Sequence, residues 1–249
     1  MDPYGLDFSH PVDRLEEALK IVRLCLTSRG PIDFEGRYFT LDGALMDLVA
    51  PKGKTPEIWV AGHGPRMLEL TAAYGDGWYP TMLGSPREYA SKLEAIRATA
   101  REAGRDPEAI TPALHRFVVV APTEEEARAM LQTRAMRAFG LSAPAELWLE
   151  FGLEHPLGEH FRGYVDFVPG RYDRKTIEEA MATVPPGLVE KGPLMWGTPE
   201  QLADQLGGFG EAGLRHVVLA PVSGLVSRKA AIYGIRATRK VARLLAGER

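Results

Sequence analysis

The segment 58–82 constrains the fold most, because it predicts a strand, a glycine turn, a helix and a second strand in succession. Its first residues, 58–61, form an apolar run that is typical of a short buried strand. Pro65 follows the turn, where its fixed φ and missing N–H suit the first position of a helix. Gly75 predicts the end of that helix as a left-handed cap, and Asp76 begins the next strand.

The turn after the first strand also predicts an anion site. We expect it to leave the N–H groups of Gly64, Arg66 and Met67 without partners, directed to one spot at the positive end of the helix dipole. A phosphate fits such a place, and the Arg66 side chain can add a cation. A side chain at Gly64 is expected to crowd the phosphate and to strain the turn. The alternative is a turn that only packs the helix on the sheet, since short glycine motifs are common.

Strands and helices alternate along the rest of the chain. Strands are predicted at about 58–62, 77–80, 114–121 and 216–220, and the main helices at 11–27, 85–103, after Thr123, from Thr198 to Gly213, and at 227–246. This alternation predicts a parallel α/β sheet with right-handed crossovers. The length of 249 residues suits a complete (β/α)8 barrel, yet the pattern predicts only four barrel strands.

Two further segments depart from this alternation. Residues 34–41 predict a short hairpin or an irregular excursion, since Gly36 separates two β-prone pieces. Residues 140–193 are rich in Pro and Gly and predict an irregular insertion with partial helix. We expect this insertion to lie within a single domain that covers residues 1–249.

Composition and charge argue against several classes of function. A net charge of -3 argues against binding to nucleic acid or to an anionic membrane. No apolar run approaches the roughly 18 residues of a membrane span, and the N-terminus does not resemble a signal peptide. The one cysteine, Cys25, lies on the apolar face of a predicted helix and excludes an internal disulfide. We expect a cytoplasmic protein without a metal site.

Five motifs, in this order, resemble the bacterial luciferase-like oxidoreductase superfamily. They occupy residues 7–23, 34–39, 56–67, 75–78 and 196–202. The strings Ala-Gly-His-Gly-Pro-Arg-Met (61–67) and Asp-Gly-Trp-Tyr-Pro-Thr (76–81) are most similar to the branch that uses the deazaflavin coenzyme F420, phthiodiolone ketoreductases and glucose-6-phosphate dehydrogenases among them. The resemblance is good over 4–131 and 195–222 and thin over 140–193.

The resemblance implies a TIM-barrel-type α/β fold of which this chain holds the C-terminal part. In the family, the helix that matches residues 11–27 follows barrel strand four, so the chain is expected to hold strands five to eight. The family's main acid/base residues precede that helix, as an Asp/His-type pair and a Glu after strand four. We therefore expect the catalytic residues on a missing N-terminal part and assign none here.

The resemblance also implies which residues bind the cofactor. The family binds the coenzyme's phosphate with the loop after strand five, which maps onto Gly62, His63, Gly64, Pro65, Arg66 and Met67. Thr81, after strand six, matches a position that lines the pocket; the alternative is a turn residue before the next helix. Trp78 and Tyr79 form either aromatic walls or core. His115 is interpreted as a buried, hydrogen-bonded histidine rather than as an acid or base.

The implied function is hydride transfer between F420 and the carbonyl or alcohol group of a small to medium apolar substrate. The first alternative is an FMN-dependent monooxygenase of the same superfamily. Others are a non-catalytic protein that keeps the cofactor-tail loop, and an unrelated phosphate-binding barrel such as an isomerase. Because an open half-barrel exposes unpaired strand edges, we expect a homodimer.

Overall fold

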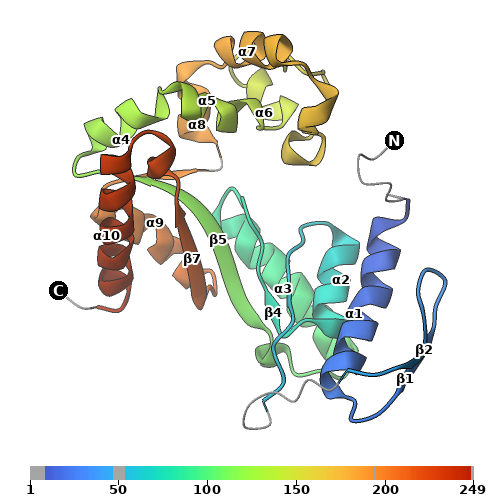
Figure 1. Cartoon of the computed structure of the whole chain (residues 1–249). Helices are drawn as coiled ribbons and strands as arrows, with labels where there is room; N and C mark the ends of the chain where they lie inside the picture. Colours follow the sequence, from blue (N-terminus) through green and yellow to red (C-terminus); the bar gives the residue numbers. More distant parts are fainter. Residues whose placement is uncertain (1–8, 47–53, 193, 248–249) are drawn as a thin grey trace. The chain divides into compact units, whose positions relative to one another are not determined.

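The computed structural model describes residues 9–46, 54–192 and 194–247 (Figure 1). Residues 7 and 8 of the first motif therefore lie outside the described residues. The chain divides into two compact units, one of residues 1–80 and 91–113 and the other of residues 81–90 and 114–249. Within the described ranges, no helix is long and apolar enough to cross a membrane.

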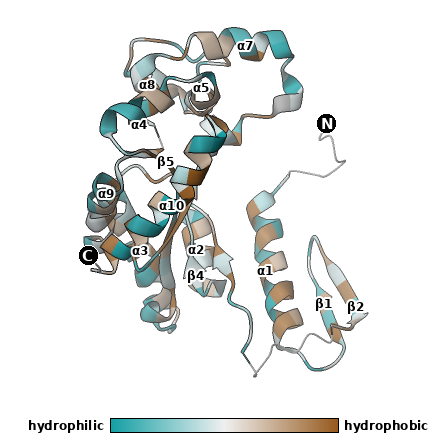
Figure 2. Cartoon of the chain, turned by 60° about the vertical axis from the view of Figure 1, so that its left-hand side comes forward, coloured by the Kyte–Doolittle hydropathy of each residue, from teal (hydrophilic) through white to brown (hydrophobic). Residues whose placement is uncertain are grey.

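The first unit begins with helix α1 (Pro11–Thr27), which the sequence predicts with the same bounds. Hydrophobic and hydrophilic residues alternate along it, as the periodicity requires (Figure 2). The predicted hairpin follows as antiparallel strands β1 (Ile32–Glu35) and β2 (Thr40–Ala44). The carboxylate of Glu17 fastens the hairpin to α1, because it accepts the backbone N–H groups of Arg37, Tyr38 and Phe39 at 2.8 to 3.1 Å.

Three parallel strand segments form the sheet of the first unit. β3 (Trp59–Val60) pairs with β4 (Gly77–Trp78), and β4 pairs with the first residues of β5 (Thr111–Val120). Helix α2 (Pro65–Tyr74) connects β3 to β4, and helix α3 (Pro86–Glu102) precedes β5. The predicted parallel arrangement is thereby confirmed.

Asp76 lies between α2 and β4 and holds the end of this segment in place. Its carboxylate accepts the N–H of Ile58 at 2.8 Å and binds Arg23 of α1 at 2.8 Å, so it joins the strand to the helix. The predicted left-handed cap at Gly75 is wrong, because this residue has φ -80°. The chain leaves α2 directly in extended form, since the N–H groups of Asp76 and Gly77 both donate to the Ile58 carbonyl.

The second unit holds the rest of β5 with two further strands. The predicted last strand is present as β7 (His216–Pro221), and β6 (Met195–Gly197) adds a three-residue strand that the sequence does not predict. Both strands pair with β5, and the pairing between β5 and β6 is parallel. Helices α9 (Pro199–Glu211) and α10 (Arg228–Leu245) pack on these strands, and Thr198 and Gln201 form the predicted capping box of α9.

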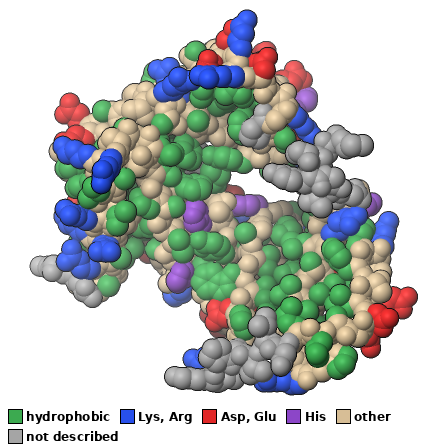
Figure 3. Space-filling view, viewed as in Figure 1, with side chains coloured by type: hydrophobic (Ala, Val, Ile, Leu, Met, Phe, Trp, Pro, Cys, Tyr) green, Lys and Arg blue, Asp and Glu red, His purple; other side chains and the backbone are tan. Residues whose placement is uncertain are grey.

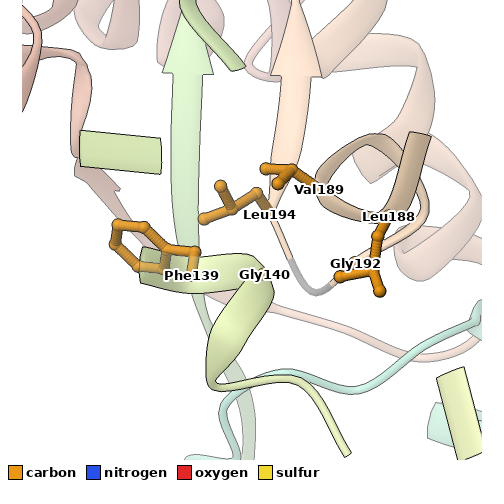
Figure 4. A pocket seen from close by; sticks show the side chains of 6 residues that line it. All are labelled: Phe139, Gly140, Leu188, Val189, Gly192 and Leu194. Carbon is orange, nitrogen blue, oxygen red and sulfur yellow. The ribbon is translucent and has the colours of Figure 1, made fainter. Parts of the chain in front are cut away.

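Short helices make up most of residues 124–191. They are α4 (Glu124–Leu131), α5 (Arg134–Leu141), α6 (Ala145–Leu149), α7 (Arg174–Ala182) and α8 (Pro186–Lys191). Apolar side chains surround Gly140 of α5 and leave no room for a water molecule (Figure 4). The contact between α5 and α8 is therefore packed core. That residues 140–193 form an insertion within a single domain stays a prediction.

Candidate anion-binding site

The turn between β3 and α2 leads into the N-terminus of α2, where two backbone N–H groups are available as hydrogen-bond donors. Gly64 is the N-cap residue and Pro65 the first helical residue. The Gly64 carbonyl accepts the N–H groups of Met67 at 2.9 Å and Leu68 at 3.1 Å. The expectation of a third donor at Met67 is therefore wrong, because the tight first turn uses that N–H. Within the described part of the chain, the N–H groups of Gly64 and Arg66 have no acceptor.

The two glycines of the turn serve different purposes. A Cβ at Gly62 would lie 2.5 Å from the Cβ of Met67, so glycine is needed there for close approach of the helix. A Cβ at Gly64 would meet no heavy atom within 4 Å. Gly64 has φ -76°, a conformation open to any residue, so the expected strain on substitution is absent. The space beside Gly64 is open, as a ligand site requires.

Two side chains donate hydrogen bonds to backbone carbonyls of the turn. Trp78 is fully buried, and its indole N–H donates to the Gly62 carbonyl at 3.0 Å. Trp78 was expected to be either core or a pocket wall, and its full burial supports the core. Lys92 of α3 donates its Nζ to the His63 carbonyl at 3.0 Å and brings a positive charge to the turn. Lys92 is not predicted from the sequence, because it lies 29 residues further along the chain than His63 and no local signal marks it.

Arg66 directs its guanidinium away from its own turn to α1. Its Nη2 lies 2.5 Å from Oδ1 of Asp13. The hydrogen bond from Arg66 lowers the pKa of Asp13 below its usual range. The other Asp13 oxygen lies 3.5 Å from Nδ1 of His10. The Arg66 guanidinium is thus paired with an acid of α1 that sequence reasoning missed, and its contribution to an anion site stays a prediction.

Thr81 belongs to the second unit. It forms an isolated parallel bridge with His115 of β5. His115 is half-buried and contacts Phe117 edge to face at 4.7 Å, and burial lowers its pKa. A role of Thr81 at cofactor or substrate stays a prediction. Among the residues described, no group of three or more His, Cys, Asp or Glu side chains is arranged to hold a metal ion.

The donors of the turn fit a phosphate group. Two backbone N–H groups at a helix N-terminus, open space beside them and two nearby cationic side chains are the elements that bind phosphate in proteins. The six residues from Gly62 to Met67 are brought together in this turn. Gly64 and Arg66 supply the donors, while Gly62 and Met67 shape the turn.

Sequence comparison supports the resemblance noted above. Residues 1–216 match the family model described as luciferase-like monooxygenase. The phthiodiolone/phenolphthiodiolone dimycocerosates ketoreductase of Mycobacterium tuberculosis is 41% identical over 219 residues, which are 88% of this chain and 57% of that protein. The F420-dependent hydroxymycolic acid dehydrogenase of the same organism is 37% identical over 130 residues, 51% of this chain and 34% of that protein. The chain thus spans 57% of the length of the ketoreductase.

Structural comparison confirms the predicted fold class. A solved structure of an F420-dependent secondary alcohol dehydrogenase, in complex with an F420-acetone adduct, superposes with a TM-score of 0.67 at 23% identity. The match covers 97% of this chain and 64% of that one. The chain therefore has the α/β fold of the luciferase-like, TIM-barrel-type enzymes.

Proposed function

The chain belongs to the luciferase-like monooxygenase family, and from this premise we propose that it transfers a hydride between coenzyme F420 and a carbonyl or alcohol substrate. The identity to a ketoreductase and to an F420-dependent dehydrogenase supports this cofactor and this reaction. The observation that carries the proposal is the turn 62–67, whose open donors suit the phosphate of such a cofactor. Reduced F420, when bound, supplies the hydride.

The residues of the turn divide the binding work. The N–H groups of Gly64 and Arg66 donate to the phosphate. Lys92 adds positive charge from the side of His63, and Trp78 fixes the Gly62 carbonyl so that the turn keeps its shape. We propose that Thr81 lines the substrate or cofactor pocket and that the substrate is a small to medium apolar molecule.

Binding of F420 to the purified chain tests the proposal. We expect saturable quenching of tryptophan fluorescence by F420 and oxidation of reduced F420 by an added ketone. Gly64→Asp should weaken F420 binding at least about tenfold, because it sets a carboxylate against the phosphate in open space.

Gly30→Asp is the matched control, since a Cβ at Gly30 also meets nothing within 4 Å and introduces the same charge. It should bind F420 like the parent. Equal affinity in the Gly64 and Gly30 variants would remove the turn from the cofactor site.

A second candidate is an FMN-dependent monooxygenase, which the description of the matching family favours. It predicts FMN that remains bound through purification and oxygen consumption with reduced FMN. Tight FMN binding together with no F420 binding would replace the first proposal by this one.

A further inference from the structure

An ion pair joins the first turns of two helices beside the proposed phosphate site. Arg66 is the second residue of α2, and Asp13 is the third residue of α1. Their side chains meet at 2.5 Å and remain 58% and 30% exposed, respectively. Figure 3 shows Lys and Arg side chains over the beginning of α1. The Arg66 guanidinium is therefore bound and reachable from solvent at the same time.

Other charges near this pair leave Asp13 as the direct partner of Arg66. Glu16 and Glu69 act on Arg66 only through space, and Glu16 itself binds Lys20 at 2.8 Å. His10 lies on the far oxygen of Asp13. Removing the charge of Asp13 thus releases the Arg66 guanidinium, whereas removing the charge of Glu16 or Glu69 leaves it paired.

We infer that Asp13 is a specificity-determining residue, which competes with the ligand's phosphate for the Arg66 guanidinium. The inference rests on the proposed function for the identity of the ligand. Arg66 contributes its backbone N–H to the site, so rotation of its own side chain brings the guanidinium to an anion held there. Asp13 is left in solvent when this happens, and an exposed pair is exchanged at little cost.

Because Asp13 and the phosphate compete for Arg66, the affinity depends on the charge of the phosphate. Asp13 offsets Arg66, so the turn favours a phosphate of low charge. In F420 the phosphate is a diester with one negative charge, whereas the monoester of FMN carries about -1.5 to -2 at pH 7. Asp13 thus favours the deazaflavin over FMN through repulsion of the more highly charged group.

Four proteins test this inference: the parent, Asp13→Asn, Arg66→Gln and the double variant. Affinities for F420 and FMN are measured by fluorescence titration at low salt. We expect Asp13→Asn to bind FMN about three- to fivefold more tightly and F420 less than twofold more tightly. Arg66→Gln should weaken both, and Asp13→Asn should bring much less gain in the Arg66→Gln background. A gain in affinity cannot arise from damaged folding.

Glu16→Gln is the matched control, because it removes the same charge from α1 without freeing Arg66. It should change the ratio of FMN to F420 affinity by less than half the effect of Asp13→Asn. An unchanged ratio in Asp13→Asn, or an equal gain with and without Arg66, would overturn the inference.

The outcome separates this inference from the proposed function. If F420 binds the parent and every variant alike, the cofactor assignment stands and the role of Asp13 is refuted. If F420 binds none of them while FMN binds and responds to Asp13→Asn, the role of Asp13 stands and the assignment to F420 falls.

Discussion

Replacement of Trp78 by phenylalanine should destabilise the first unit and loosen the turn. The substitution removes the indole N–H and leaves the Gly62 carbonyl without this partner in a buried place. An unpaired buried polar group costs about 1 to 3 kcal/mol. The smaller ring in a fully buried site adds about 1 to 2 kcal/mol for lost contacts and the gap it leaves. The expected loss is therefore about 2 to 5 kcal/mol, with weaker F420 binding at conditions where the protein stays folded.

The assay is urea unfolding followed by circular dichroism, with unfolding free energies from the linear dependence on urea. Trp148→Phe is the matched control, because Trp148 is also fully buried, yet its indole nitrogen has no hydrogen-bond partner among the described residues. It should lose about 1 to 3 kcal/mol less than Trp78→Phe. Equal losses in the two variants would refute the structural role of the bond to Gly62.

Three further predictions concern packing, pH and assembly. Gly140→Ala should destabilise the second unit by about 1 to 3 kcal/mol in urea unfolding, because its Cβ would lie 2.5 Å from Cγ1 of Val184; Gly207→Ala, in open space on α9, should be neutral or stabilising. Burial lowers the pKa of His155 and outweighs its bond to the Leu141 carbonyl, which acts in the opposite direction. Stability should therefore be full above about pH 6.5 and fall as the pH drops below it, and His155→Asn should flatten this dependence in thermal unfolding. Size-exclusion chromatography with light scattering should give a homodimer of twice the 27.4 kDa chain mass, and a stable monomer would contradict this.

Local sequence signals account for most of the predicted helices and strands. Helices α1 and α9 have the expected N-terminal bounds, because a proline in the first turn and the capping box at Thr198 act within a few residues. The three-residue strand β6 was missed, since so short a run gives no period. The end of α2 was misjudged because Gly75 commonly marks a left-handed cap, whereas here bonds to Ile58 set the backbone.

The candidate site was predictable in its backbone but not in its side-chain partners. The Gly-x-Gly-Pro string indicates the donor-rich turn, although it does not reveal that the Met67 N–H is already used. Asp13 lies 53 residues from Arg66 in the sequence, and Lys92 lies 29 residues from His63. Such pairs depend on tertiary packing, for which no local pattern exists.

The most direct test of the account is a titration of the isotope-labelled protein with F420, observed by amide NMR. The phosphate should shift the amide signals of Gly64 and Arg66, whose N–H groups are open to it. The Met67 signal should move less, because its N–H is bound to the Gly64 carbonyl. Saturable binding that leaves Gly64 and Arg66 unshifted, or no binding at all, would contradict the account.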